Sequence, residues 1–160
     1  MVSSEEPQIP SIYVSSMVEI KFRSGNLTSA EQAILMAGFS RHSEATSAPP
    51  FGKERLAWIA YNGQDAIGIL TADLLWDWLY IDELWVDENY RGQGLGKSLM
   101  KQAENYAASQ QLVGLWLWTQ SWQAADFYAK LGYQKFTRFE DFPRGYSRIG
   151  FRKQNLTSGE

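Results

Sequence analysis

The first half of the chain shows two kinds of apolar spacing in turn. Residues 17–23 alternate apolar and charged side chains, and a period of two predicts a half-buried β-strand. Thr28 to Glu31 then has the spacing of a helix capping box, with apolar residues at helical intervals after it. Pro49 and Pro50 cannot continue a helix, so residues 40–53 are predicted to form a mobile loop.

A meander of three strands is predicted in the middle of the chain. Residues 54–61 and 66–75 are rich in apolar and aromatic side chains, and Asn62-Gly63 between them supplies the positive φ angles that a tight hairpin needs. Residues 78–86 form a third strand-like run. The first two of these segments are therefore expected to pair as antiparallel strands, with the third beside them.

Helical and strand periods alternate in the second half. Residues 91–110 carry their apolar side chains on one face, which predicts an amphipathic helix. Residues 114–118 are apolar on both faces, as in a buried strand parallel to an earlier one. A short helix over 124–131 and strands over 133–139 and 146–152 complete the order β-α-β-β-β-α-β-α-β-β. The predicted fold class is α+β, with a mixed, mostly antiparallel sheet flanked by helices.

Composition limits the chain to one globular core. Its 160 residues are 44% hydrophobic and 21% charged, which is enough for one core and too little for two. One domain is therefore expected over residues 17–153, with flexible tails over 1–16 and 154–160.

Charge and residue counts exclude several functional classes. The net charge of −3 argues against nucleic acid as a partner. The absence of cysteine excludes disulfides and thiolate chemistry, and the single histidine, His42, excludes a His-rich metal site and is interpreted as solvated or helix-capping. Asp77 interrupts the longest apolar run, and the first twenty residues lack a signal-peptide pattern. A cytoplasmic protein with no metal and no membrane partner is expected.

The most informative segment is the glycine-rich run between Val86 and Ser98. It lies where a predicted strand meets a predicted helix, so its backbone N–H groups and the helix N-terminus can hold a pyrophosphate. A nucleotide-hydrolysing P-loop needs a glycine where Arg91 stands, and a dinucleotide-binding fingerprint needs one where Lys97 stands. Neither of these two loops fits.

The pattern Arg91-x-x-Gly94-x-Gly96 after an apolar strand resembles the acetyl-CoA loop of the GNAT superfamily of N-acetyltransferases. Residues 84–86 before it and 127–133 after it resemble two further signatures of this family. The predicted element order is similar to the GNAT order, so the resemblance covers roughly the whole predicted domain. It implies acetyl-CoA as the co-substrate. The backbone amides that would hold its pyrophosphate belong to Gly92, Gln93, Gly94, Leu95, Gly96 and Lys97, with charge added by Arg91 and Lys97.

The resemblance also implies how the thioester is held. In this family the strand before the loop bulges and separates from its parallel neighbour, which leaves its N–H groups free for the pantetheine arm and the thioester carbonyl. On this chain those groups belong to Leu84, Trp85 and Val86, and residues 115–118 would form the opposite wall.

Three further site positions follow from the family pattern. Tyr128 matches a tyrosine that often donates a proton to the leaving thiolate. Glu83 or Asp82 matches a carboxylate that takes the amine proton, with Glu83 slightly preferred; both cannot serve unless the bulge turns them to the same side. Ser121 stands where relatives often carry an asparagine that binds the pantetheine arm, although capping of a helix near Trp122 is its simpler role.

The acceptor is expected to contact two loops, residues 40–53 and 139–146. Glu140 and Asp141 would attract a cationic amine. Tyr146 stands where one group of small bacterial relatives commonly has a histidine, so a role carried by that imidazole is not expected here. The candidate aromatic walls of the acceptor site are Trp76, Trp78, Trp118 and Trp122.

These features predict an acetyl-CoA-dependent N-acetyltransferase that acts on a primary amine of a small molecule. Transfer is expected to be direct, in a ternary complex, because no cysteine is available to carry the acyl group. Two alternatives stay open: an N-terminal or lysine acetyltransferase that acts on a protein, and a non-catalytic acyl-CoA-binding regulatory module. A homodimer is also compatible with the aromatic-rich composition.

Overall fold

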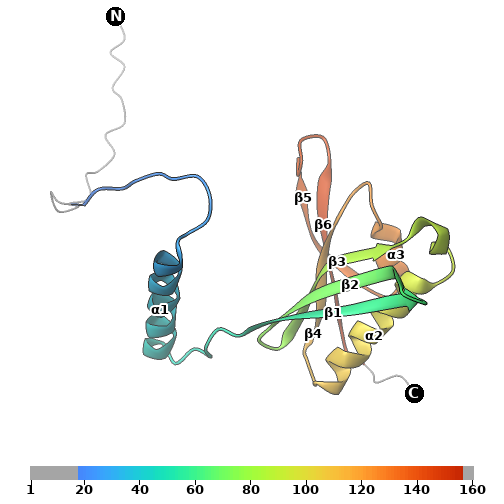
Figure 1. Ribbon diagram of the computed structural model, residues 1–160, viewed down its shortest axis with the longest axis horizontal. Helices are drawn as coiled ribbons and strands as arrows, with labels where there is room; N and C mark the ends of the chain where they lie inside the picture. The colour runs from blue at the N-terminus through green and yellow to red at the C-terminus, as the bar shows by residue number, and fades with distance from the viewer. Residues whose placement is uncertain (1–17, 157–160) are drawn as a thin grey trace, which may run out of the picture. The chain divides into compact units, whose positions relative to one another are not determined.

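The computed structural model describes residues 18–156 (Figure 1). It comprises two compact units that meet in the sequence between Thr46 and Ser47, and each unit is described by itself. The single domain expected over 17–153 stays a prediction, and the tail expected over 1–16 lies outside the described residues.

Within residues 18–46, the described part of the first unit, the chain forms helix α1 (Ser29–Ala45), and the predicted capping box at its start is confirmed. The Thr28 hydroxyl accepts a hydrogen bond from the Glu31 N–H at 3.2 Å, and the Glu31 carboxylate accepts one from the Thr28 N–H at 2.7 Å. Two donors that the first helical turn would otherwise leave unpaired are thereby satisfied.

The strand predicted over residues 17–23 is not formed in the part that the structure describes, residues 18–23. Residues 18–28 contain neither helix nor strand, and Val18, Ile20 and Phe22 expose 61%, 92% and 94% of their surface. A strand needs a neighbour to satisfy its backbone donors and acceptors. Among the described residues no strand pairs with this segment, so its alternating pattern alone does not produce a strand.

The loop predicted over residues 40–53 is shorter than expected. Helix α1 continues through Ser40 and ends at Ala45, after which the Thr46 N–H donates to the His42 carbonyl at 3.1 Å. Pro49 and Pro50 therefore lie beyond the last turn of α1 and do not shorten the helix. His42 is exposed in that turn, which agrees with its interpretation as a solvated histidine.

The second unit contains a sheet and its helices. Its elements are β1 (Lys53–Asn62), β2 (Asp65–Leu75), β3 (Trp78–Val86), the 3₁₀-helix η1 (Glu88–Tyr90), α2 (Leu95–Ser109), β4 (Gly114–Gln120), α3 (Ala125–Lys130), β5 (Gln134–Glu140) and β6 (Ser147–Gln154). The six strands form one sheet in the order β1-β2-β3-β4-β6-β5, in which β3 and β4 are parallel and the other neighbours are antiparallel. This confirms the predicted fold class and, apart from the missing first strand, the predicted element order.

The hairpin between β1 and β2 forms one residue later than the sequence predicts. Asn62 pairs with Asp65, so the two loop residues are Gly63 and Gln64. Gly63 has a φ of +61°, which a glycine adopts without steric cost.

Helix α2 packs against β1 to β4 (Figure 1). Its buried side chains, including Leu99, Met100 and Ala103, contact Leu70 and Leu79 of the sheet in one apolar core. Each of these five side chains is at most 5% exposed. Burial of this apolar surface is the main favourable contribution to the stability of the second unit.

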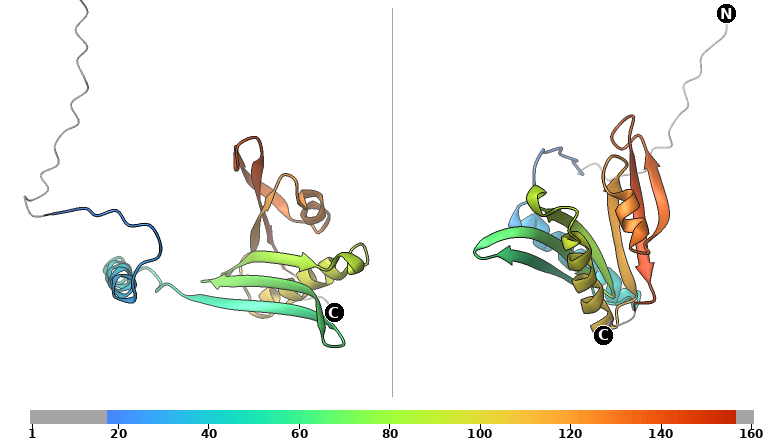
Figure 2. Two further views of the ribbon diagram at one scale, coloured as in Figure 1. Left: turned by 45° about the horizontal axis from the view of Figure 1, so that its top comes forward. Right: turned by 90° about the vertical axis from the view of Figure 1, so that its right-hand side faces the viewer.

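Strands β3 and β4 separate partway along their length. Their pairing runs from Trp78 beside Gly114 to Ile81 beside Leu117 and ends there. Beyond that point β3 continues along β2, while β4 continues along β6. Figure 2 shows the β1–β3 part of the sheet diverging from the β5–β6 part. The separation opens a wedge between two strands that a continuous sheet would keep hydrogen-bonded.

Candidate active site

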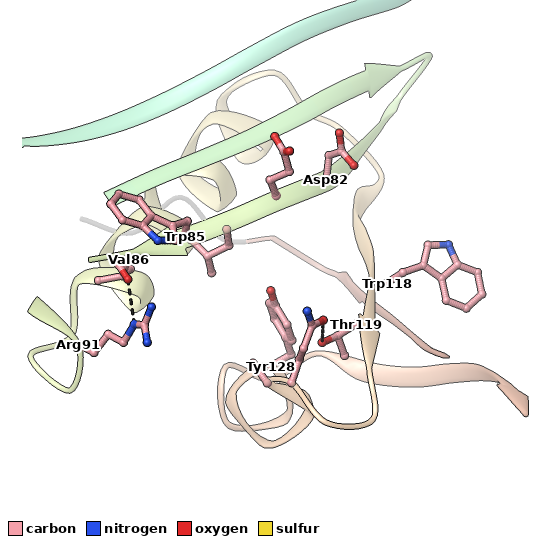
Figure 3. Close-up of a pocket in the computed structure, with 11 residues that line it drawn as sticks. Asp82, Trp85, Val86, Arg91, Trp118, Thr119 and Tyr128 are labelled. Atoms are coloured by element: carbon pink, nitrogen blue, oxygen red, sulfur yellow. Dashed lines mark hydrogen bonds between the residues drawn. The ribbon is translucent and has the colours of Figure 1, made fainter. Parts of the chain in front are cut away.

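Two adjoining grooves open at the wedge between β3 and β4. The first, here called the wedge groove, has a volume of about 590 Å³ and lies between the end of β3 and the side chains of Trp118 and Tyr128 (Figure 3). The second, the loop groove, has a volume of about 570 Å³ and lies between α3 and the loop before α2. Leu84, Val86 and Arg91 line both grooves, so a single elongated ligand can occupy the two.

The end of β3 turns two backbone N–H groups toward the wedge. The Asp87 N–H donates to a β2 carbonyl at 2.9 Å, and strand N–H groups alternate in direction, so the Trp85 N–H also faces β2. The N–H groups of Leu84 and Val86 therefore face the wedge, where β4 no longer pairs with β3. The Val86 carbonyl accepts from Arg91 Nε at 2.9 Å. The pairing thus directs the Trp85 N–H, which is predicted to be free, toward β2, and Trp85 also lines the wedge groove.

A β-bulge in β3 brings both candidate carboxylates to the same groove. Thr71 of β2 pairs with Glu83 and the next residue, Ala72, pairs with Ile81, so Asp82 is an extra residue without a partner. Both Asp82 and Glu83 line the wedge groove. The bulge thus removes the constraint that adjacent strand residues point to opposite sides.

Arg55 of β1 contacts the two carboxylates. Its Nη1 lies 2.7 Å from Asp82 Oδ2, and its Nη2 lies 3.3 Å from Glu83 Oε2. The Thr71 hydroxyl accepts from Arg55 Nη2 at 3.0 Å and donates to Glu83 Oε2 at 2.8 Å. Hydrogen bonding to Asp82, and then to Asp73, raises the pKa of Arg55 above its ordinary value, so the guanidinium stays charged.

A buried carboxylate, Asp73, lies behind this arginine. It is 5% exposed, and its oxygens lie 3.2 Å from Arg55 Nη1 and 3.0 Å from Lys53 Nζ. Burial acts to raise the pKa of Asp73, but the hydrogen bonds and charges of Lys53 and Arg55 outweigh it and lower the pKa. With Asp82 and Glu83, the cluster sets three carboxylates against two cations, so the net charge beside the wedge groove is negative.

The loop before α2 presents unpaired backbone N–H groups. Gly92 and Gly94 have φ angles of +72° and +85°, and no side chain caps the helix that starts after Gly94. The first hydrogen bond within the helix runs from the Ser98 N–H to the Gly94 carbonyl at 2.9 Å. The N–H groups of residues 95–97 therefore have no partner in the helix. Together with the helix dipole, they form a site suited to a phosphate group.

The loop groove is narrow beside Gly96. A Cβ atom at this position would lie 3.5 Å from the Phe127 ring and 3.7 Å from Val86, so a longer side chain would fill the groove. All the loop residues predicted to bind the coenzyme line this groove except Gln93, whose side-chain amide donates to the Asn89 carbonyl at 3.0 Å.

Tyr128 of α3 lies across the wedge groove from β3. Its side chain is 8% exposed, and the rings of Tyr133 and Phe151 lie 6.1 Å from its own. Figure 3 shows its hydroxyl end directed toward β3. Burial raises the pKa of Tyr128 to about 12, so its hydroxyl is protonated at neutral pH and can donate a hydrogen bond into the groove.

Ser121 does not cap a helix. Helix α3 begins later than expected, at Ala125, and the Ser121 hydroxyl instead accepts from the Ser147 N–H of β6 at 3.2 Å. Ser121 lines neither groove, whereas Gln123 lines the wedge groove and accepts from the Gln120 N–H at 3.0 Å. Gln123 is not among the residues predicted from the sequence to form the site. The sequence does contain a signal for this role: Gln123 has a side-chain amide and lies two positions after Ser121, where relatives often carry an asparagine.

The wall opposite β3 lies further along β4 than predicted. Within the expected range 115–118, Leu115 and Leu117 are buried and still pair with β3. Only after them does the wedge open, so Trp118 and Thr119 form the wall (Figure 3).

Most other residues predicted to contact the acceptor lie outside the two grooves. Glu140 forms an ion pair with Arg138 at 2.5 Å, and Asp141 accepts a backbone N–H of its own turn at 3.0 Å. Tyr146 packs edge-on against Trp122 at 4.8 Å between ring centroids. Of the four candidate tryptophans, Trp118 lines the wedge groove, and Trp76, Trp78 and Trp122 line neither groove.

Residues 18–156 contain no group of three His, Asp or Glu side chains placed to hold a metal ion. None of the helices described in this range is long and apolar enough to cross a membrane.

The sheet opens at its parallel strand pair, and an uncapped glycine loop leads into a helix beside the opening, as expected for a coenzyme-A-dependent acyltransferase. The family model of the acetyltransferase (GNAT) family matches residues 28–133, which is more than half of the chain. The chain belongs to the GNAT acetyltransferase family.

Comparison with individual proteins gives a consistent picture. The chain is 38% identical over 79 residues to the blasticidin-S acetyltransferase of Streptomyces morookaense, a match that covers 49% of this chain and 58% of that protein. An acetyltransferase from Bacillus cereus has a similar structure, with a TM-score of 0.71 and 27% identity over 83% of this chain and 97% of that one. A Bacillus anthracis protein assigned as a streptothricin acetyltransferase, in complex with acetyl coenzyme A, has a TM-score of 0.57 and 26% identity over 62% of each chain.

Proposed function

We propose that this chain transfers an acetyl group from acetyl-CoA to a primary amine of a small molecule, by direct transfer in a ternary complex. The observation that carries the proposal is the wedge between β3 and β4, which exposes backbone N–H groups between a phosphate-binding loop and a pair of carboxylates. The chain has no cysteine to carry the acyl group, which favours direct attack by the amine.

The loop groove fits the coenzyme in size and chemistry. Its uncapped N–H groups would hold the diphosphate, and Lys97 at its edge adds a positive charge. The pantetheine arm would pass Leu84 and Val86, which line both grooves, and would bring the thioester into the wedge. Gln123 lies on the far wall of the wedge and would contact the arm there.

Each chemical need of the transfer has a residue in the wedge groove. The substrate supplies an acetyl group activated as a thioester. The Leu84 N–H would stabilise the negative charge that develops on the carbonyl oxygen. One of the two carboxylates, Asp82 or Glu83, would take the proton that the cationic amine must lose before it attacks the thioester. As the C–S bond breaks, Tyr128 would donate a hydrogen bond to the departing thiolate, which would receive the second proton from the nitrogen.

The acceptor would enter at the negatively charged side of the wedge groove. Amines of ordinary pKa, about 10, are cationic at neutral pH, and the excess carboxylate beside Asp82 and Glu83 attracts such a group. Two relatives are named for the antibiotics blasticidin-S and streptothricin, which supports a small-molecule acceptor.

Thiol release from acetyl-CoA, measured with a panel of amines, tests the proposal. We expect release that depends on the amine and that is fastest with small molecules carrying more than one amino group. Release with peptides but not with small amines would favour a protein acceptor. Tight binding of coenzyme A without release for any amine would contradict an enzymatic function.

Replacement of Tyr128 by phenylalanine is expected to lower kcat by about tenfold, the order of a single hydrogen bond to a charged group. Because the pKa of Tyr128 is about 12, its hydroxyl stays protonated between pH 7 and pH 10. The ratio of wild-type to variant kcat should therefore be constant across this range. A ratio that falls toward 1 as the pH approaches 10 would show that Tyr128 ionises at its ordinary pKa, contrary to its buried position.

A further inference from the structure

We propose that Arg55 is a positioning residue for the acyl-transfer site, which holds Asp82 as a fixed anchor and leaves Glu83 as the group that takes the amine proton. This inference rests on the proposed function and assigns different roles to the two carboxylates. Arg55 itself lines neither the wedge groove nor the loop groove. It acts from β1, across β2, on residues of β3.

The contacts of the two carboxylates differ. Asp82 Oδ2 lies 2.7 Å from Arg55 Nη1, and the Asp82 side chain is 37% exposed. Glu83 is 67% exposed and contacts Arg55 at 3.3 Å, with the Thr71 hydroxyl bonded to the same oxygen, Oε2. Among residues 18–156 the structure gives no hydrogen bond to Asp82 Oδ1 or to Glu83 Oε1, so the two carboxylates differ in their distance from the guanidinium and in their exposure. Glu83 is the more exposed of the two and lies further from the guanidinium, so an amine entering the groove reaches its open oxygen more readily, while the Thr71 hydroxyl holds the other oxygen in place.

The bulge creates the need for such an arginine. It places two successive carboxylates, Asp82 and Glu83, on the same groove, where their like charges repel each other. Nη1 of Arg55 contacts Asp82 and also the buried Asp73, and Nη2 contacts Glu83. An ammonium group cannot reproduce this planar fork, so lysine is not an equivalent replacement.

The test compares Arg55→Met and Arg55→Lys with the matched control Lys53→Met. Lys53 lies two residues away on the same strand and contacts Asp73, but it contacts neither Asp82 nor Glu83 in the structure. Lys53 and Arg55 both pair with the buried Asp73, so Lys53→Met and Arg55→Met each take one partner from that carboxylate and are expected to lower stability to a similar extent. Cooperative unfolding at similar melting temperatures would verify that both variants fold and that Lys53→Met is a matched control.

We expect Arg55→Met to lower kcat by about 10- to 100-fold, the order of effect that follows from misplacement of a catalytic group. KM for acetyl-CoA should not change, because the loop groove is intact. Arg55→Lys should recover part of the loss, and Lys53→Met should retain the wild-type kcat. Equal losses in Arg55→Met and Lys53→Met, or no loss in Arg55→Met, would overturn the inference. A wild-type protein that acetylates no amine would instead contradict the proposed function.

Discussion

Replacing Glu83 with glutamine is expected to lower kcat/KM for the amine by about 10²- to 10⁴-fold, the range typical for loss of a general base. In the structure the Thr71 hydroxyl donates to Glu83 Oε2 at 2.8 Å. Glutamine has nearly the same size and can still accept this hydrogen bond, but it cannot take a proton. The affinity for coenzyme A should be unchanged, because the side chain of Glu83 is not part of the loop groove. Steady-state kinetics with a saturating acetyl donor, together with calorimetric titration of coenzyme A, measure both quantities.

Asp82→Asn is the matched control for this experiment. It makes the same chemical change one residue away, at the carboxylate that is closest to Arg55. If Asp82 is an anchor, its amide keeps part of the contact with the guanidinium, and the loss in kcat/KM should be below about tenfold, the order of one hydrogen bond to a charged group. A larger loss for Asp82→Asn than for Glu83→Gln would reverse the two roles.

Gly94→Ala is expected to weaken coenzyme A binding by about 10- to 100-fold, which corresponds to the loss of one or two hydrogen bonds to a charged group. Gly94 has a φ of +85°, and an alanine there is strained by about 1–3 kcal/mol. No atom lies within 4 Å of the added Cβ, so the effect arises from the backbone and not from a clash. The loop can relieve the strain only by turning its peptide groups, which moves their N–H groups away from the diphosphate.

Gly63→Ala separates this local effect from a general loss of stability. Gly63 also has a positive φ, +61°, and open space around its Cβ position, but it lies in the β1–β2 hairpin. Both variants should lower the melting temperature by a similar amount, and only Gly94→Ala should raise the Kd for coenzyme A. Similar Kd values for the two variants would show that the amides of the glycine loop do not bind the diphosphate.

The features that the sequence predicts well are those set by neighbouring residues. The capping box at Thr28, the hairpin near Gly63 and the glycine loop before α2 each depend on a few adjacent positions whose conformational preferences are strong, although α2 begins at Leu95 and not at residue 91 as predicted. The sequence therefore predicts that the glycine loop lies at a strand-to-helix junction, and it predicts which residues of the loop line the groove beside it.

The features that the sequence does not reveal depend on contacts between distant segments. The alternation over residues 17–23 is that of a strand, but whether it becomes one depends on a partner elsewhere. The family resemblance implies a bulge in the strand before the glycine loop, but its position at Asp82 is defined only by the pairing with β2, and this position brings both carboxylates to the wedge groove. Arg55 is 27 residues from Asp82 in sequence, so no local pattern connects them.

A crystal structure of the protein with acetyl-CoA tests the central claim most directly. The claim is that the amides of residues 92–97 bind the diphosphate and that the thioester lies between the separated strands β3 and β4. We expect diphosphate oxygens within hydrogen-bonding distance of these N–H groups, and the thioester carbonyl oxygen within hydrogen-bonding distance of the Leu84 N–H. A coenzyme bound elsewhere, or β3 and β4 hydrogen-bonded along their full length, would contradict the claim.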